Sequence, residues 1–346
     1  MSFTITLQPA ERQFSVERDE AILPAAIRQG VGMPYGCRDG ACGSCKSKLI
    51  EGRVIHGAHQ LKALPLDEEE AGYILTCCAV PQTDCLVEAR SVPGAGDYPV
   101  LKLPSRVISI DRPAADVAIV RMQLPANQNL RYRAGQYVEF ILRDGARRSY
   151  SMANAPHHLG EPPAIELHLR HMPGGRFTDH VFAAMKERDI LRMEGPFGSF
   201  FLREDSDKPI VLLASGTGFA PIKALVEHMQ HTGSTRPSVL YWGARRRADL
   251  YQHDWCVAAA ASMPQLRYVP VLSESLPEDQ WAGRSGLVHR AVMADWPDLT
   301  GHQVYACGAP VMVESAARDF VTSCGLPAVE FYADSFTSEA DKHGAS

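Results

Sequence analysis

The sequence predicts a multidomain chain: a small α+β domain, an antiparallel β-barrel, and an α/β domain with a doubly wound parallel sheet. The chain has 346 residues, which at roughly 100–200 residues per domain suggests two or three domains. Residues 91–105 are rich in glycine and proline without periodic apolar positions, as is typical of a linker. From about residue 207, strand-like and helix-like runs alternate, which indicates a parallel sheet.

The first domain is predicted over residues 1–92. Apolar residues alternate from Phe3 to Leu7 and again from Phe14 to Val16, on either side of a turn, so this start should form a hairpin. Asp19 then precedes a stretch with apolar residues at helical spacing, which predicts a helix. A cysteine-rich segment follows.

The second and third domains differ in the period of their apolar residues. After a linker at 93–103, residues 104–206 contain short apolar runs separated by turn residues, and these predict a β-barrel. Residues 207–346 should form the α/β domain. We expect strands at 117–122, 137–142, 165–169, 209–214, 239–242, 266–272 and 303–306, and helices at 178–186, 220–231, 287–295 and 311–323.

The composition narrows the class of protein. With 45% hydrophobic residues the chain can build cores, so general disorder is excluded. The net charge of −5 argues against nucleic acid as the main partner, because phosphate binding needs a basic excess. The sequence has no apolar run long enough to span a bilayer and no visible signal peptide, so a cytoplasmic protein is expected.

Four of the nine cysteines have the spacing of metal ligands. Cys37, Cys42 and Cys45 follow the pattern C-x4-C-x2-C, and Cys77 lies farther along the chain. This is the spacing of plant-type [2Fe–2S] clusters. The alternatives are buried thiols in a glycine-rich loop or a zinc site, although zinc sites usually show paired C-x2-C knuckles. Cys78 is an alternative fourth ligand, and Cys85, Cys256 and Cys324 are interpreted as ordinary buried thiols.

The segment from Tyr35 to Cys45 resembles the ferredoxin module of oxygenase reductases, which implies a β-grasp fold. In that family the fourth ligand follows a Leu-x-Cys pattern. Leu75-Thr-Cys77 matches this pattern, so the resemblance favours Cys77 over Cys78.

A second motif follows in the barrel. Arg148-Ser149-Tyr150-Ser151 is by itself a weak signal, because exposed strands often carry one Arg and one Tyr. A glycine pair then precedes a helix start, which offers free N–H groups to a phosphate. Together they resemble the flavin-binding barrel of the ferredoxin–NADP reductase superfamily. The resemblance implies that Arg148 holds the FAD pyrophosphate, Tyr150 packs on the flavin ring and Ser151 bonds near its reactive nitrogen. It assigns the phosphate-binding helix start to Gly174, Gly175 and Thr178.

Two further barrel residues, His168 and Arg170, fall in the strand that lines the flavin in that superfamily. The alternative for His168 is a structural role, in which its ring only makes hydrogen bonds inside the barrel.

A third motif begins the α/β domain. Gly216-Thr217-Gly218 follows an apolar run and precedes Pro221, an order of strand, glycine-rich turn and helix that suits a pyrophosphate. G-T-G-x-x-P after a flavin barrel resembles the superfamily's nicotinamide signature. The resemblance further assigns cofactor contacts to Gly243, Arg245, Cys307, Gly308 and Phe336, and catalytic positions to Ser151 and Cys307. The alternative for Cys307 is a buried thiol at a strand end.

The dinucleotide is predicted to be NADH. Arg245, Arg246 and Arg247 could hold the 2′-phosphate of NADPH, which keeps NADPH as the alternative. Relatives with G-x-R at this position commonly use NADH.

Over nearly its whole length the chain resembles the family of CDP-6-deoxy-3,4-glucoseen reductase and the reductase components of oxygenases. That resemblance implies electron transfer from NADH to FAD, to a [2Fe–2S] cluster and to a partner protein. The partner would be a Rieske-type or other oxygenase, or a pyridoxamine-phosphate-dependent sugar dehydratase. A free flavin reductase (diaphorase) or a redox-sensing protein are the alternatives.

Overall fold

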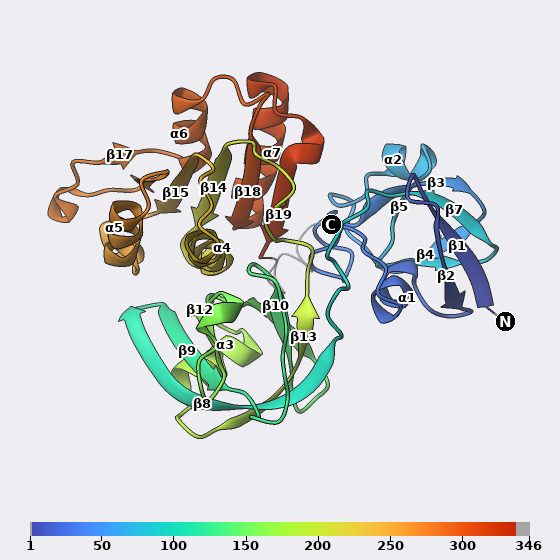
Figure 1. The fold of residues 1–346 in the computed structure, drawn as a ribbon, viewed down its shortest axis with the longest axis horizontal. Helices are drawn as coiled ribbons and strands as arrows, with labels where there is room; N and C mark the ends of the chain where they lie inside the picture. The colour runs from blue at the N-terminus through green and yellow to red at the C-terminus, as the bar shows by residue number, and fades with distance from the viewer. Residues whose placement is uncertain (1, 337–346) are drawn as a thin grey trace. The chain divides into compact units, whose positions relative to one another are not determined.

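The computed structural model describes residues 2–336, which form two compact units, each taken by itself here (Figure 1). The first unit contains residues 2–100 and 196–199. The second contains residues 101–195 and 200–336. Residues 337–346, which the predicted α/β domain includes, lie outside the described residues.

The first unit is built on a five-stranded sheet with the strand order β2-β1-β7-β3-β5. β1 and β2 form the predicted antiparallel hairpin, in which Ile5 pairs with Phe14. Ile5, Leu7, Phe14 and Val16 are buried, and Phe3 is half-buried. β1 pairs in parallel with β7, so the two ends of the domain meet in one sheet. The strands are β1 (Ser2–Gln8), β2 (Arg12–Glu17), β3 (Lys46–Glu51), β4 (Val54–His56), β5 (Tyr73–Leu75), β6 (Ala79–Pro81) and β7 (Cys85–Glu88).

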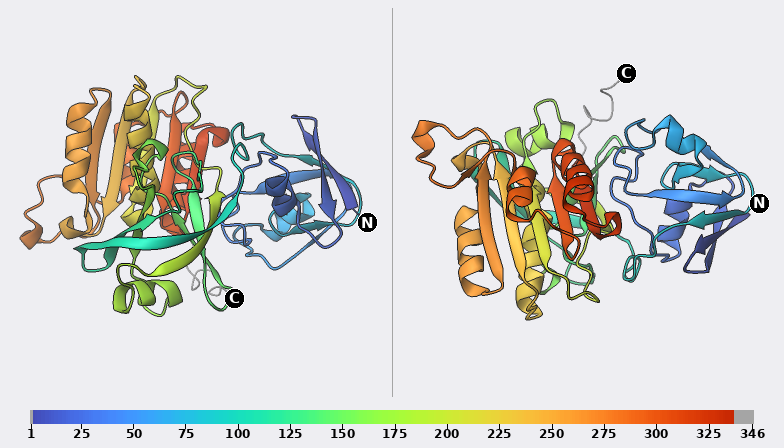
Figure 2. Two further views of the ribbon diagram at one scale, coloured as in Figure 1. Left: turned by 60° about the horizontal axis from the view of Figure 1, so that its bottom comes forward. Right: turned by 90° about the horizontal axis from the view of Figure 1, so that it is seen from above.

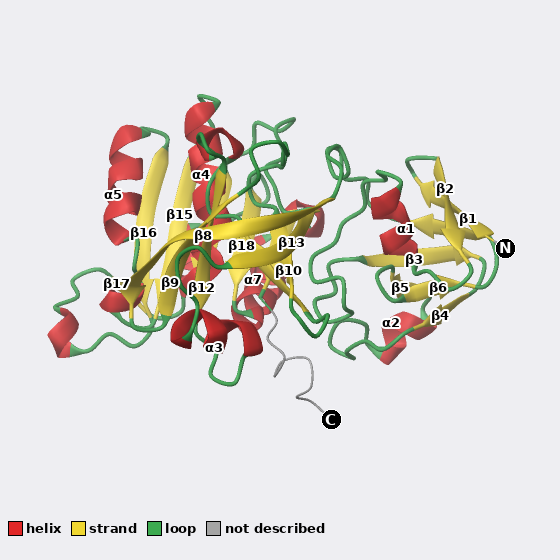
Figure 3. Cartoon of the chain, turned by 90° about the horizontal axis from the view of Figure 1, so that it is seen from below, coloured by secondary structure: helices red, strands yellow, loops and turns green. Residues whose placement is uncertain are grey.

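Helix α1 (Ile22–Arg28) packs on this sheet, as Figure 3 shows. Ile22, Leu23, Ala25 and Ala26 are buried, which is the apolar stripe that the sequence predicted. Helix α2 (Leu66–Glu70) buries none of its residues and begins with an acidic turn.

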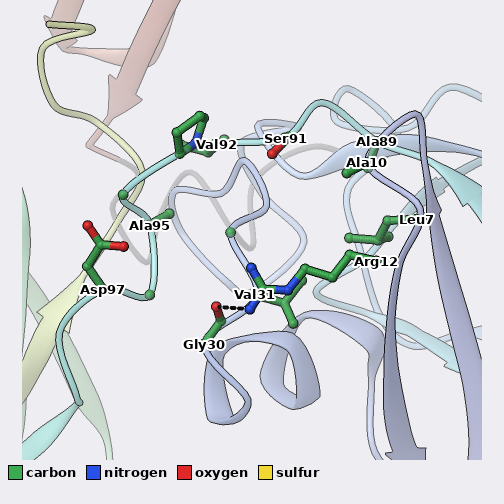
Figure 4. A pocket seen from close by; sticks show the side chains of 14 residues that line it. Leu7, Ala10, Arg12, Gly30, Val31, Ala89, Ser91, Val92, Ala95 and Asp97 are labelled. Carbon is green, nitrogen blue, oxygen red and sulfur yellow. Dashed lines mark hydrogen bonds between the residues drawn. The ribbon is translucent and has the colours of Figure 1, made fainter. Parts of the chain in front are cut away.

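The glycine- and proline-rich segment is attached to the first unit. Val92 and Ala95 are buried, and a Cβ on Gly32 would collide with the carbonyl oxygen of Val92. A cavity of about 310 Å³ remains between this segment and the end of α1 (Figure 4). Arg12 spans it and donates to the carbonyl oxygen of Gly30 (3.2 Å). None of the residues that line this cavity is a predicted site residue.

The second unit begins with a six-stranded antiparallel sheet of order β11-β10-β13-β8-β9-β12. Its strand β8 starts at Leu101, three residues inside the predicted linker. Alternating side chains from these strands and from α3 enclose one apolar core. The elements are β8 (Leu101–Ala114), β9 (Val117–Gln123), β10 (Tyr137–Ile141), β11 (Arg147–Ser151), β12 (Ala164–Arg170), α3 (Arg176–Ala183) and β13 (Ile190–Phe197).

The rest of the second unit is a six-stranded parallel sheet of order β17-β16-β15-β14-β18-β19. Helices cover both faces (Figure 2): α4 and α5 pack with one core, and α6 and α7 with the other. β14 and β18 are buried at almost every residue, as central strands of a parallel sheet require. The elements are β14 (Ile210–Ser215), α4 (Phe219–His231), β15 (Ser238–Ala244), α5 (His253–Ser262), β16 (Leu266–Leu272), β17 (Arg284–Ser285), α6 (Val288–Asp295), β18 (Gln303–Gly308), α7 (Pro310–Cys324) and β19 (Phe331–Ser335).

The predicted fold class is confirmed in all three parts. The expected strands and helices are present with shifts of a few residues. The expectation omitted β8, β13, β17 and α5 in the second unit, and β3 to β7 and α2 in the first. In β8, Pro104 and the buried Ser105 interrupt the apolar alternation. α5 has almost no amphipathic pattern, because four of its ten residues are consecutive alanines.

Candidate functional site

The four predicted cluster ligands lie together in the first unit as two pairs. The loop between α1 and β3 carries Cys37, Cys42 and Cys45, and Cys77 follows β5. In the first pair the backbone N–H of Cys37 donates to Cys42 Sγ (3.4 Å). In the second pair Cys45 Sγ lies 3.3 Å from Cys77 Sγ.

Thr76 positions the second pair, Cys45 and Cys77. Its hydroxyl donates to the carbonyl oxygen of Cys45 (3.2 Å), and its backbone N–H is 3.4 Å from the same oxygen. Thr76 is fully buried, and its own carbonyl oxygen accepts from the N–H of Leu23 in α1 (2.8 Å). This residue was not singled out from the sequence, and only its place between Leu75 and Cys77 hinted at a role.

The first pair favours one ionised thiol. Hydrogen bonds from Cys37 and then from Ser44 lower the pKa of Cys42 to about 6, against the effect of burial. The side-chain hydrogen bond between the two thiols, which lowers the pKa of Cys42, raises the pKa of Cys37. Metal binding requires thiolates and releases such protons, so a lowered pKa in one member assists it.

The two pairs fit a two-iron cluster, because each iron of a [2Fe–2S] group takes two thiolates. Within residues 2–336, no three His, Cys, Asp or Glu side chains gather as a site for a single metal ion. Cys78 Sγ lies 3.5 Å from Cys77 Sγ. Cys78 is half-buried, whereas Cys77 is buried and its Sγ lies 3.3 Å from that of Cys45.

The second unit carries the predicted flavin residues on β11. Tyr150 is half-buried with its ring 5.3 Å from that of Phe177, and burial raises the pKa of its hydroxyl. Arg148 is half-buried and donates to the carbonyl oxygen of Arg147 (2.7 Å). Ser149 is exposed on the opposite side of the strand and donates to Glu139 (3.3 Å).

The glycine pair precedes α3, as expected. A Cβ on Gly174 would meet no atom within 4 Å, so there is room for a ligand beside this backbone. The Gly174 N–H donates to Asp179 Oδ2 (3.1 Å). Thr178 is buried, and its hydroxyl bonds to the carbonyl oxygens of Met172 (3.0 Å) and Gly175 (3.2 Å). Thr178 therefore shapes the turn.

His168 belongs to a buried network between the barrel and α4. Its Nδ1 lies 2.9 Å from the hydroxyl of Tyr251, and its Nε2 lies 3.1 Å from Glu166 Oε1. Burial alone would raise the pKa of Glu166, but the bond from His168 and the charge of Lys223 lower it to about 2. Burial lowers the pKa of His168. Both ring nitrogens of His168 are thus engaged by protein groups.

Arg170 points to the glycine-rich turn. A Cβ built on Gly216 would lie 2.9 Å from Arg170 Nη1, so the guanidinium lies directly over this turn. Its Nε donates to Asp116 Oδ2 (2.8 Å), and Arg245 approaches the same oxygen (3.8 Å). The carboxylate of Asp116, which was not expected from the sequence, thus gathers two cations beside the turn.

The glycine-rich turn, residues Gly216–Gly218, joins β14 to α4 as predicted, and Pro221 lies in the first turn of α4. A Cβ on Gly218 would collide with the carbonyl of Cys307, so only glycine lets these two loops pack. Trp242 Nε1 donates to the carbonyl oxygen of Gly216 (3.1 Å). The turn is therefore fixed from two neighbouring strands, and Thr217 within it is buried.

β11, which carries the predicted flavin residues, meets strands β18 and β19 of the parallel sheet at one point. Ser151 is 4% exposed and donates to Asp334 Oδ2 on β19 (3.2 Å). Asp334 pairs in register with Cys307, and the Phe336 N–H donates to the carbonyl oxygen of Gly308 (2.9 Å). Cys307 is fully buried, and burial, with the charge of Asp334, raises its thiol pKa. Asp334 was missed because only the geometry shows its bond to Ser151.

The three arginines after β15 are differently engaged. Arg246 Nε lies 2.7 Å from Asp279 Oδ2, and its Nη2 is 3.1 Å from Glu278 Oε1. Arg247 donates to the carbonyl oxygen of Asp279 (3.3 Å). The side chain of Arg245 is 57% exposed, with Asp116 and Asp249 each 3.8 Å away. Gly243 is buried at the end of β15, where a Cβ would meet Val288.

Thiol pairs in one unit, and a flavin strand joined to a dinucleotide turn in the other, define an iron–sulfur flavoprotein oxidoreductase. Family comparisons agree. Residues 5–82 match the "2Fe-2S iron-sulfur cluster binding domain", residues 104–202 the "Oxidoreductase FAD-binding domain" and residues 212–318 the "Oxidoreductase NAD-binding domain". The chain therefore has domains for a [2Fe–2S] cluster, FAD and a nicotinamide dinucleotide.

Full-length relatives are similar over the whole chain. The CDP-6-deoxy-L-threo-D-glycero-4-hexulose-3-dehydrase reductase of Yersinia pseudotuberculosis is 38% identical, covering 97% of this chain and 99% of the relative. The phenol hydroxylase P5 protein of Acinetobacter pittii is 34% identical, covering 99% and 96%. The Amycolatopsis cytochrome P450 reductase GcoB superposes with a TM-score of 0.80 at 33% identity, covering 97% and 99%.

The chain belongs to this family of three-domain reductases, which includes sugar-dehydrase reductases and oxygenase reductase components. It is an NAD(P)H-dependent oxidoreductase in which electrons pass through FAD and the cluster to an acceptor. Among residues 2–336, no helix has the length and apolarity to cross a membrane.

Proposed function

We propose that this chain is the NADH-dependent reductase of a two-component system whose electron acceptor is a separate protein. The proposal rests on one observation. The chain has two pairs of cysteines in its first unit, and its second unit has the proposed flavin strand and dinucleotide turn. A nicotinamide gives two electrons together, whereas a [2Fe–2S] cluster carries one at a time. An iron–sulfur cluster on this chain is therefore useful when the acceptor takes electrons one at a time.

The proposed cluster ligands are the four paired thiols. Cys37 with Cys42, and Cys45 with Cys77, would supply the four thiolates that hold a [2Fe–2S] cluster. Thr76 acts as a positioning residue that holds the backbone of Cys45 beside Cys77.

The proposed flavin site lies along β11 and at the start of α3. Arg148 binds the FAD pyrophosphate, Tyr150 packs against the flavin ring, and Ser151 bonds near its reactive edge with its orientation set by Asp334. There is space beside the Gly174 backbone for a phosphate, which would replace Asp179 as the acceptor of the Gly174 N–H. Supporting roles fall to Ser149, Gly175 and Thr178, which shape the strand and the turn.

The proposed nicotinamide site is the turn from Gly216 to Gly218 with the strand end at Cys307 and Gly308. We assign Arg170 to the pyrophosphate of this dinucleotide instead of to FAD, because it lies over Gly216. The remaining positions support the walls of the site: Thr217, Pro221, Gly243 and Phe336. His168 takes a structural role, because protein groups engage both of its nitrogens.

NADH is the proposed donor. The second strand of a dinucleotide domain is where the 2′ position of the cofactor is read. At the end of that strand Arg246 is held by Asp279 and Glu278, and the two carboxylates would repel a 2′-phosphate. Arg245 is also drawn toward carboxylates.

The proposed domain boundaries follow from these cofactor assignments. We propose a ferredoxin domain over residues 1–92, a FAD barrel that begins with β8 at Leu101, and a nicotinamide domain that begins with β14 at Ile210. We place the protein in the cytoplasm, where thiols remain reduced until they bind iron.

The names of the relatives point to two classes of acceptor, a CDP-sugar dehydrase and an oxygenase. We propose that the acceptor belongs to one of these classes, and that an oxygenase acceptor is a Rieske-type or other oxygenase component. The test is reconstitution. The purified protein, NADH and a candidate acceptor from the same gene neighbourhood should give substrate turnover that requires all three. Turnover that proceeds equally with the acceptor and free reduced flavin alone would reject a specific reductase.

A further inference from the structure

A cluster of buried charges lies where α4 packs against the barrel. Lys223 and Glu227, one turn apart on α4, are each 6% exposed. Lys223 Nζ lies 2.6 Å from Glu227 Oε1 and 3.2 Å from Glu166 Oε1 on β12. Burying charges is costly unless they are paired, so this lysine is held in the structure by partners from both domains.

The same two α4 side chains hold a barrel segment that follows the flavin strand. Lys223 Nζ donates to the carbonyl oxygen of Ala153 (3.2 Å), and the Ala155 N–H donates to Glu227 Oε2 (2.8 Å). Between them, Asn154 accepts from the Tyr132 hydroxyl (2.8 Å). Both ends of residues 153–155 are therefore fastened to the nucleotide domain.

These contacts join the two halves of the redox site. Residues 153–155 begin two positions after Ser151, where the flavin strand β11 ends. α4 begins at Phe219, directly after the turn Gly216–Gly218, and Lys223 lies one turn into the helix. Glu166 extends the connection, because it also bonds His168, whose ring packs 6.3 Å from that of Phe219.

We propose that Lys223, with Glu227 and Glu166, is a positioning residue for hydride transfer that fixes the barrel and the dinucleotide turn at a working separation. The inference rests on the proposed function. Reacting atoms must meet within narrow limits, and a misplacement of about 1 Å can cost on the order of 100-fold in rate. The buried ion pairs of Lys223 with Glu227 and Glu166 connect the barrel to the nucleotide domain and so restrict such displacement.

The test compares Lys223→Met, which keeps the length and removes the charge, with Lys223→Arg, which keeps the charge. Lys208→Met is the charge-removal control, because Lys208, two residues before β14, pairs with Glu330 of the nucleotide domain (2.6 Å) and is partly exposed. Three quantities are measured on the full-length holoprotein. These are the flavin reduction rate at saturating NADH, its isotope effect with [4-²H₂]NADH, and hydrogen exchange at the Ala155 amide.

In Lys223→Met we expect a limiting rate lowered about tenfold, a larger isotope effect and faster exchange at Ala155. FAD content and the Kd of NADH should stay unchanged, because neither ligand is assigned to Lys223. Lys223→Arg should recover most of the rate, and Lys208→Met should match the wild type. Hydride transfer at the wild-type rate in Lys223→Met, or an equal loss in Lys208→Met, would overturn the proposal.

A second variant covers the case in which Lys223→Met does not fold. Glu227→Gln keeps an oxygen that accepts from Ala155 but weakens the pair with Lys223, so a smaller loss of rate is expected. An unchanged rate and isotope effect there would also overturn the proposal. Hydrogen exchange at the Ala155 amide is measured without NADH, so it does not depend on the proposed function. If NADH does not reduce the wild-type flavin, the proposed function fails, and the exchange rates still show whether Lys223, Glu227 and Glu166 hold residues 153–155 in place.

Discussion

The cluster loop and the flavin–nicotinamide site are assembled in different ways. Three of the four thiols come from one short loop, and the fourth is brought in by a strand of the same small sheet. The proposed flavin–nicotinamide site instead depends on contacts such as Ser151 to Asp334, which are 183 residues apart. A local site can therefore be interpreted from spacing, whereas a site made by packing needs the fold.

The largest effect is expected at the cluster. Cys77→Ser should lose most of the iron, because its thiol is buried and pairs with Cys45. Cys78→Ser is the matched control and should keep the iron. Iron and acid-labile sulfide per chain, measured in anaerobically prepared protein, decide between them. The reverse pattern would make Cys78 the ligand.

In the second region, Arg148→Ala should weaken FAD binding by roughly 10- to 100-fold, the value of a lost bond to a charged group. The Kd is measured by titrating the flavin-free protein and following flavin fluorescence. Arg143→Ala, at an exposed position after β10, is the control and should bind FAD normally. Equal affinity in both variants would remove Arg148 from the pyrophosphate site.

Arg170→Ala tests whether FAD and NADH are bound by different arginines in the second unit. Because Arg170 lies over Gly216, the variant should raise the KM for NADH about tenfold and leave the FAD content unchanged. Arg148→Ala should show the opposite pattern. Loss of FAD with an unchanged KM in Arg170→Ala would return Arg170 to the flavin site predicted from the sequence.

The smallest effect concerns the choice between NADH and NADPH. Asp279→Asn should release Arg246 and reduce the preference for NADH by about threefold, the scale of one partly exposed ion pair. The ratio of kcat/KM for the two dinucleotides measures it. In Arg246→Ala the same change at Asp279 should have little further effect. A starting preference for NADPH would contradict the assignment.

The sequence predicted the fold class because each domain has its own apolar period. The hairpin register from Phe3 to Val16 and the buried strands β14 and β18 follow from those patterns. β8 was missed because Pro104 and the buried Ser105 break the apolar alternation of Leu101, Leu103 and Val107. The sequence also placed the linker as far as residue 103, whereas β8 begins at Leu101 and pairs there with Gly195, a partner that is distant in sequence.

The candidate sites show the same limit. The spacing of Cys37, Cys42 and Cys45 sufficed to place three thiols in one loop. Nothing in the spacing shows that Arg170 reaches Gly216, or that both nitrogens of His168 are engaged. Asp116 and Asp334 could not be found either, because single carboxylates in loops and strands are common and acquire meaning only from their partners.

The most direct test of the account is a rapid-mixing experiment on the wild type and Cys77→Ser. Each is mixed with NADH while flavin absorbance is followed, and then with cytochrome c as a one-electron acceptor. We predict that the flavin is reduced at similar rates in both proteins, because the flavin–nicotinamide unit is intact. Only the wild type should then reduce cytochrome c rapidly. Equally fast reduction of cytochrome c by the cluster-free variant would contradict the order in which electrons leave through the cluster.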